Sequence, residues 1–246
     1  MKLLTFMVAA LMASTFTFAH ATSYGNFKFT KSKNLVKIVN GQGLTVAAPS
    51  DINILGIPTA TVPTGTTTMV MQFDFRSTGF FTQETGAHIP IVLMGKWENA
   101  NPSLPPNPPT NGYLIGRGIS IGNLTAHPQG CSVPRVAVIE SFRPSSNALY
   151  TSSCSAGGGS TNVQLADNTT YHFVIYSSNT QFVEGQHFNV IYSILNGSTL
   201  LMQGFALDLT SEIPGNLGGW GIGEVLNSNP NANWTLEFNN INVIYE

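Results

Sequence analysis

Acidic residues are the first candidates for chemistry in this 246-residue chain, because glycoside hydrolysis needs two carboxylates facing each other across one cleft. Of the twelve Asp and Glu residues, Asp74, Glu140 and Glu237 fall on segments that alternate as strands do. Asp74 and Glu237 each lie between large apolar residues, which predicts that their side chains face solvent or a concave sheet. A solvent-facing acid without a catalytic role is the simpler interpretation of each one.

The histidines and the nucleophile motifs do not indicate a catalytic centre. No two histidines have the i, i+2 spacing that would put two metal ligands on one face of a strand. The sequence also has no Gly-x-Ser-x-Gly, Walker or dinucleotide-binding motif. His172 alternates with aromatic residues of the expected core, which predicts that it lies on the opposite face of its sheet. The five histidines are His20, His88, His127, His172 and His187.

Aromatic residues beside one long loop are better candidates, because sugars stack their apolar faces on aromatic rings. Trp97 begins a proline-rich loop over residues 97–111, and Tyr113 follows it. Long loops in compact domains are often functional. Arg117 has the strand parity of Tyr113, and we predict that these two residues and Trp97 line a ligand-binding concave face. The alternative for Arg117 is a structural ion pair with an acid such as Glu140.

The elements that position these residues are strands. Apolar side chains recur with period two, most clearly over residues 169–245, and period two projects side chains to opposite faces of a sheet. Asn239 and Asn240 shift this parity by one, which predicts a β-bulge. The only helix-like piece is a short turn around residues 210–217. The expected strands are residues 24–30, 35–39, 44–48, 68–75, 89–94, 113–121, 136–139, 171–177, 188–195, 200–207, 219–225 and 234–245.

The N-terminus has the three parts of a secretory signal peptide. Lys2 is followed by an apolar run and by the small-x-small sequence Ala19-His20-Ala21. We expect cleavage after Ala21, so that residues 22–246 form one secreted domain in the periplasm or outside the cell. The sequence has no later apolar segment long enough for a transmembrane helix.

Charge argues against nucleic acid as a partner. Lys and Arg number 10 and Asp and Glu number 12, so loss of Lys2 leaves 9 − 12 = −3 for the mature chain. Nucleic-acid binding normally requires a basic patch. One lysine cluster does occur, and it predicts an edge strand guarded by lysines, with a polyanion-binding patch as the alternative. This cluster contains Lys28, Lys31, Lys33 and Lys37.

The chain has two cysteines, Cys131 and Cys154. An even number in an exported chain predicts a disulfide. The bridge would close a loop of about two dozen residues and contribute roughly 3 kcal/mol by restricting the unfolded chain. The alternative is two free thiols or a metal pair.

Several segments resemble the jelly rolls of concanavalin A-like lectins and glucanases. Residues 165–175 (Leu-Ala-Asp-Asn-Thr-Thr-Tyr-His-Phe-Val-Ile) and 188–192 (Phe-Asn-Val-Ile-Tyr) resemble their paired strands. Residues 218–223 and 234–243 resemble their closing strands, and residues 135–142 are similar to one strand of leguminous lectins. The resemblance implies an all-β, antiparallel two-sheet sandwich and a glycan or polysaccharide as the partner.

Departures from that family bear on activity. Glu140 stands where leguminous lectins have metal-binding acids, but Ser141 and Phe142 follow it, and no Asp-rich segment comes next. Because Ca²⁺ needs several oxygen ligands, we expect no cofactor, and the sequence does not support calcium. The acidic triplet of the family's hydrolases is absent. The alginate-lyase branch has an Arg-rich strand and a Gln-x-His segment, which Arg76 and His88 match only in part.

These observations favour a secreted, lectin-like carbohydrate-binding or surface-adhesion protein without evident catalytic machinery. A second hypothesis is a diverged polysaccharide lyase or glycoside hydrolase, which would require a set of polar residues to converge in one groove. A third is an exported structural protein that assembles through its sheet edges. The residues of the enzyme hypothesis are Arg76, His88, Arg117 and Glu140.

Overall fold

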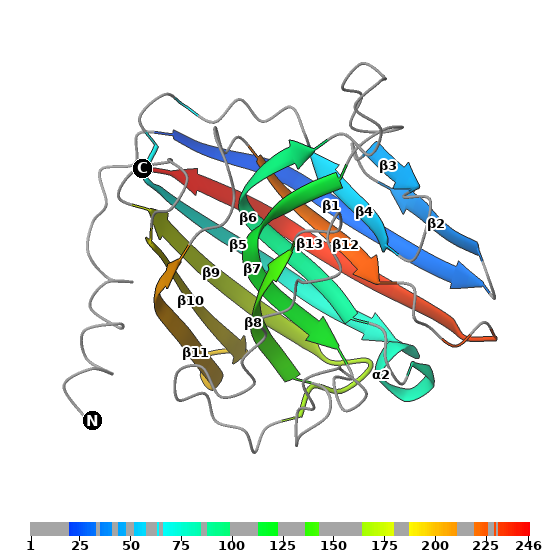
Figure 1. Ribbon diagram of the computed structural model, residues 1–246. Coiled ribbons are helices and arrows are strands. Elements are labelled where there is room, and N and C mark those ends of the chain that lie inside the picture. Colours follow the sequence, from blue (N-terminus) through cyan, green and yellow to red (C-terminus); the bar gives the residue numbers. More distant parts are fainter. Residues whose placement is uncertain are drawn as a thin grey trace.

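The computed structural model of the protein describes residues 20–32, 35–40, 44–47, 52–57, 63, 66–84, 88–98, 113–122, 136–142, 164–179, 187–210, 219–225, 229 and 231–246. These residues form two antiparallel sheets that lie face to face (Figure 1). Three predicted features lie outside this part. They are the disulfide between Cys131 and Cys154, residues 99–111 of the proline-rich loop, and residues 1–19 of the signal peptide. Among the described residues, no helix has the length and apolar character needed to cross a membrane.

The seven-stranded sheet contains both the first and the last strand. Its order is β11-β10-β9-β5-β13-β1-β2, and every neighbouring pair is antiparallel. Its strands are β1 (His20–Ser32), β2 (Leu35–Asn40), β5 (Thr68–Thr78), β9 (Thr170–Asn179), β10 (His187–Asn196), β11 (Thr199–Thr210) and β13 (Asn233–Tyr245).

The six-stranded sheet has the order β3-β4-β12-β6-β7-β8. Because the chain passes repeatedly from one sheet to the other, the predicted antiparallel two-sheet jelly roll is confirmed. A short helix of one turn, α2 (Phe80–Gln83), follows β5. The strands of this sheet are β3 (Leu44–Ala47), β4 (Ile52–Ile57), β6 (His88–Glu98), β7 (Tyr113–Gly122), β8 (Val136–Phe142) and β12 (Gly219–Val225).

The core follows from the two-residue period. Along β5 every second side chain is buried, and the same alternation holds along β13 on either side of the Asn pair. Phe73 stacks on Phe173 with ring centroids 5.1 Å apart, and Phe238 packs against Phe73 at 5.5 Å. Both Phe173 and Phe238 are fully buried, as their strand parity predicts.

The predicted β-bulge is present on β13. Its pairing with β5 shifts between Asn239 and Asn242. Asn240 has φ 55°, a left-handed conformation that asparagine tolerates better than most residues. Because of the extra residue, Phe238 and Ile241 are both buried. The bulge therefore leaves Asn240 on the outer face of the sheet while the core pattern continues.

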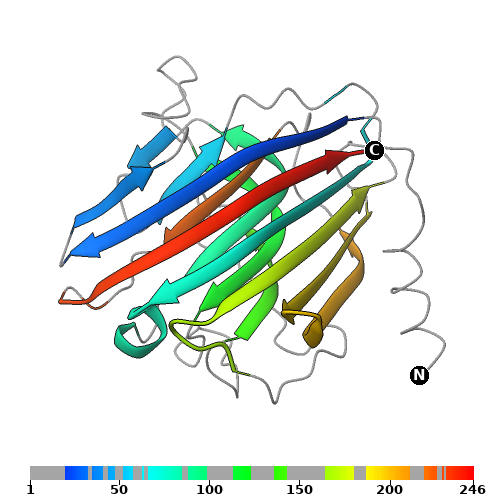
Figure 2. The same ribbon diagram turned by 180° about the vertical axis from the view of Figure 1, so that it is seen from behind.

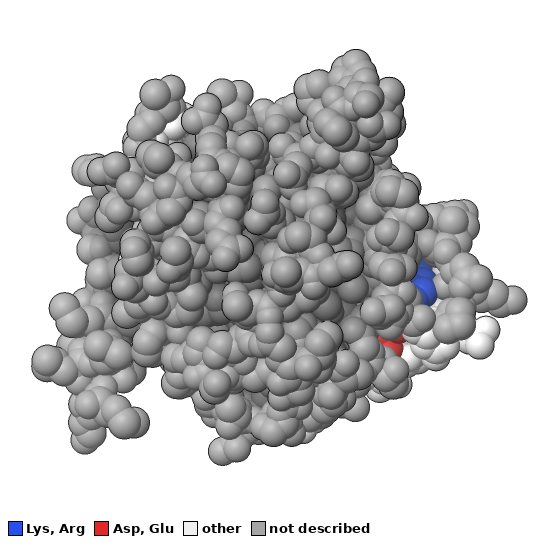
Figure 3. Space-filling model, in the orientation of Figure 1, with Lys and Arg blue, Asp and Glu red and all other residues white. Residues whose placement is uncertain are grey.

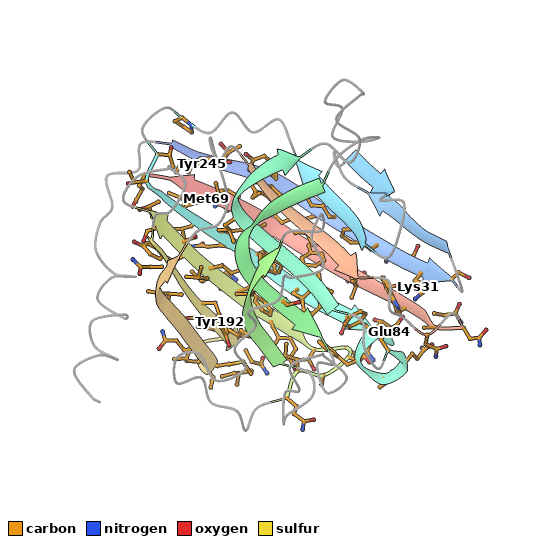
Figure 4. All side chains as sticks on the ribbon, viewed as in Figure 1. Lys31, Met69, Glu84, Tyr192 and Tyr245 are labelled. Atoms are coloured by element: carbon orange, nitrogen blue, oxygen red, sulfur yellow. The ribbon has the colours of Figure 1, made fainter. Side chains whose placement is uncertain are left out.

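A buried ion pair closes the core beside α2. Lys31 Nζ lies 2.9 Å from Glu84 Oε1, and the same oxygen accepts a 2.7 Å hydrogen bond from Trp234 Nε1. The backbone N–H of Asn229 donates to Glu84 Oε2 at 2.8 Å. Lys31 and Glu84 are almost completely buried and face each other in Figure 4.

The predicted lysine-guarded edge holds for only part of the lysine cluster. β2, which carries Lys37, is the edge of the seven-stranded sheet, whereas β1, which carries Lys28 and Lys31, pairs with β13 on one side and β2 on the other. Lys31 has the strand parity of the buried Phe27 and Phe29, so its ammonium group is directed into the sandwich, where Glu84 neutralises it. The number of lysines in a segment does not reveal which lysine side chain faces the core.

Removing one partner of this pair should strongly destabilise the protein. We expect Glu84→Gln to lower the free energy of unfolding by about 3–5 kcal/mol, since it removes a negative charge in direct contact with the buried ammonium group of Lys31. The matched control is Glu237→Gln, because Glu237 forms a more exposed ion pair with Lys28 and its loss should cost about 0–1 kcal/mol. Urea unfolding measures both changes, and equal losses would contradict the structural role of Glu84.

Candidate functional site

The residues predicted to bind ligand lie on the six-stranded sheet. Tyr113 pairs with Glu98, and Trp97 pairs with Leu114, so the backbones of Trp97 and Tyr113 are neighbours at the same end of β6 and β7. Arg117 lies four residues further along β7. The side chains of these three residues are outside the described part, and their role in binding stays a prediction.

The residues of the enzyme hypothesis do not all converge. His88 and Glu140 lie on β6 and β8, in the same sheet as Arg117, but Arg76 lies on β5 of the other sheet. The side chain of Arg76 is 43% exposed on the outer face of that sheet, away from the six-stranded sheet. Glu140 pairs with Gly118, so Arg117 and Glu140 are not cross-strand partners. Arg76 therefore faces away from the sheet that carries the other three residues, whose side chains lie outside the described part.

The described polar side chains instead gather on the outer face of the seven-stranded sheet, which faces the viewer in Figure 2. Figure 3 views the opposite side of the molecule, where described charged groups come into view only at the edge. We use the name outer polar cluster for the charged and amide side chains that β1, β5, β9 and β13 bring together on the outer face. Its members are Lys28, Asp74, Arg76, His172, Glu237 and Asn240.

One half of the cluster is a row of charges across three strands. Glu237 on β13 pairs with Lys28 on β1 and with Arg76 on β5 in the backbone register. Lys28 Nζ lies 3.0 Å from Glu237 Oε1, and Arg76 Nη1 lies 3.9 Å from Glu237 Oε2. The sheet geometry therefore places one acid between two bases, and all three side chains remain partly exposed.

The other half is centred on Asp74. His172 is its cross-strand partner, and the distance from His172 Nδ1 to Asp74 Oδ1 is 2.9 Å. Asn240 Nδ2 donates to Asp74 Oδ2 at 2.7 Å, while the backbone N–H of Asn240 donates to Asn26 Oδ1 at 2.9 Å. The β-bulge thus supplies the amide that holds the second carboxylate oxygen.

A turn before β9 fixes the position of His172. Asp167 accepts hydrogen bonds from Ser77 Oγ at 2.8 Å and from the backbone N–H groups of Phe81 and Thr82 at 3.3 and 3.1 Å. Asn168 has φ 63°, and its N–H donates to the Ser77 carbonyl oxygen at 2.7 Å. The turn is therefore tied to β5 and α2, and β9 begins in register with β5.

An apolar row lies beyond the cluster on the same face. It consists of Val70, Tyr176, Ile191 and Ile244, which are register partners on four adjacent strands and are all half-buried. Tyr176 is four residues from His172 on β9, a separation of about 13 Å along a strand. An aromatic ring and a set of hydrogen-bonding groups thus share one sheet face.

Sequence reasoning identified the outward direction of Asp74, His172 and Glu237 but did not place them together. Their partners come from strands 98 residues apart in one case and 166 in another. The sequence signal that could have linked these residues is that each one occupies an outward-facing position of its strand. Among the described residues, no three His, Cys, Asp or Glu side chains are grouped as a metal site.

Comparisons with known proteins find no matching family model and no matching curated protein. Among solved structures, a PL-14 alginate lyase from Aplysia kurodai is similar over 97% of this chain and 94% of its own, with 8% identity and a TM-score of 0.49. Lectin II from Ulex europaeus matches 94% of this chain and 100% of its own, with 9% identity and a TM-score of 0.49. A Bacillus subtilis protein of unknown function with a galectin-like fold has 13% identity, covers 94% and 91%, and has a TM-score of 0.46. Similarity this low carries no information on a ligand of this chain.

The geometry predicts the tautomer of His172. An ionised carboxylate only accepts hydrogen bonds, so Asp74 requires the proton of the neutral ring to be on Nδ1. We expect ¹⁵N NMR of the imidazole to show the Nδ1–H form in the wild type and a shift toward a mixture in Asp74→Ala. Asn240→Gly should retain the Nδ1–H form, since it keeps Asp74 and permits positive φ. An Nε2–H form in the wild type would contradict the assigned contact.

Proposed function

We propose that the protein is a secreted, lectin-like carbohydrate-binding protein. The observation that carries this proposal is the combination, on one sheet face, of half-buried Tyr176 with the hydrogen-bonding groups of the outer polar cluster. A sugar ring offers an apolar face and an edge of hydroxyl groups, so it requires both kinds of contact. Such sites typically combine apolar walls with a few oriented polar groups.

The two sheets offer two distinct places for binding. The residues Trp97, Tyr113 and Arg117 are proposed for the six-stranded sheet, on the strength of their residue types and of the loop between β6 and β7. The outer face of the seven-stranded sheet has the stronger geometric support, because the contacts among its polar side chains are known.

Secretion forms part of the proposal. The predicted cleavage after Ala21 would remove only the first two residues of β1, which pair with Tyr245 and Ile244. Pairing with β13 from Thr22 onward would remain. A mature chain beginning at Thr22 therefore keeps the central part of the sheet that carries the outer polar cluster.

Glycan binding is tested with the mature chain on a glycan array, with and without calcium, followed by titration of the bound glycan. We expect Tyr176→Ala to weaken binding roughly two- to tenfold if the sugar stacks on the outer face. Trp97→Ala should produce the loss instead if the six-stranded sheet binds the sugar. The Tyr176→Ala and Trp97→Ala variants control for each other, because the two residues lie on different sheets. An array without any bound glycan would overturn the proposal.

A further inference from the structure

The hydrogen-bonding groups of the outer polar cluster are unevenly occupied. Both oxygens of Asp74 accept hydrogen bonds, one from His172 and the other from Asn240. Glu237 directs one oxygen to Lys28 and the other toward Arg76. The acids of the cluster are therefore already engaged within the protein, and each is held by two neighbours.

Arg76 and His172 keep hydrogen-bonding groups available. The 3.9 Å contact between Arg76 and Glu237 is longer than a hydrogen bond, and no other described residue takes up the guanidinium N–H groups. His172 uses Nδ1 for Asp74, and no described residue bonds its Nε2. Both side chains are more than two-fifths exposed, at 43% for Arg76 and 41% for His172.

These groups form a compact patch. Thr170 is exposed and is the direct cross-strand partner of Arg76, while His172 follows two residues later on the same face of β9. Adjacent strands lie about 4.8 Å apart and two residues span about 6.7 Å, so one small ligand group can reach all three side chains. The patch therefore offers a guanidinium fork, a hydroxyl and an imidazole nitrogen.

We infer that Arg76 and Thr170 bind the carboxylate of an acidic sugar while His172 Nε2 accepts a hydrogen bond from a hydroxyl group of the same ligand, so that the ligand is a uronate-containing polysaccharide. This inference rests on the proposed function and names its ligand class. The planar guanidinium fork matches the two oxygens of a carboxylate, and Thr170 can donate to one of them. The remainder of the polysaccharide would extend along β9 toward Tyr176.

The charges of the outer polar cluster balance one another. Asp74 and Glu237 are matched by Arg76 and Lys28, and the partner of His172 on β10 is the uncharged Leu195.

The experiment compares a polyuronate oligosaccharide with its carboxyl-reduced form, which has the same chain without the charge. We expect wild-type mature protein to bind the polyuronate at least tenfold more tightly. Arg76→Gln should lose roughly tenfold or more in affinity for the polyuronate and little for the reduced chain, because only the charged contact is removed. Arg76→Lys should recover part of this loss, since it restores the charge without the fork.

Unfolding curves for each variant establish that the fold is retained.

The outcomes separate this inference from the proposed function. Equal binding of both oligosaccharides, tighter binding of a sulfated glucan, or unchanged polyuronate affinity in Arg76→Gln would overturn the uronate assignment. Glycan binding that depends on Trp97 instead would still support the proposed function. If no glycan on the array binds, both the uronate assignment and the proposed function are contradicted.

Discussion

The register between the first and last strands depends on where one ammonium group is buried. Lys31 pairs with Trp234 in the backbone and meets Glu84 inside the sandwich. A slip of one residue would turn Lys31 toward solvent and direct Lys28 into the core, because neighbouring side chains alternate between faces. That slip would place charged side chains in the core and apolar side chains on the outer face. The same register places Lys28 opposite Glu237, so the buried pair and the outer polar cluster are two results of one alignment.

The fold class could be predicted from local pattern because a two-residue period needs no knowledge of distant partners. Each apolar stripe, such as those around Phe173 and Phe238, lies within one segment of the chain. The parity shift at Asn239 and Asn240 also lies within one segment. The inward direction of Lys31 could not be predicted in the same way. Its counter-charge, Glu84, follows a helical turn 53 residues later, and the lysine cluster was more simply explained as an exposed edge.

The contacts within the candidate site could not be predicted from local sequence patterns. Parity predicts that His172 faces outward, but its partner Asp74 comes from a strand that precedes it by 98 residues. For the six-stranded sheet, residue types indicated Trp97, Tyr113 and Arg117, whereas the register between β7 and β8 was needed to show that Arg117 and Glu140 are not opposite each other. Arg76 was grouped with residues of the other sheet, because sequence spacing does not reveal the sheet to which a strand belongs.

The adjacency of β1 and β13 also determines when folding can finish. The first strand lies between β2 and β13, so its inner edge stays unpaired until the final thirteen-residue strand is available. Contacts between chain ends are slow to form, because a loop of nearly the whole chain must close first. For the secretion proposed above, this means that β1 would gain its β13 neighbour only after the last strand had crossed the membrane.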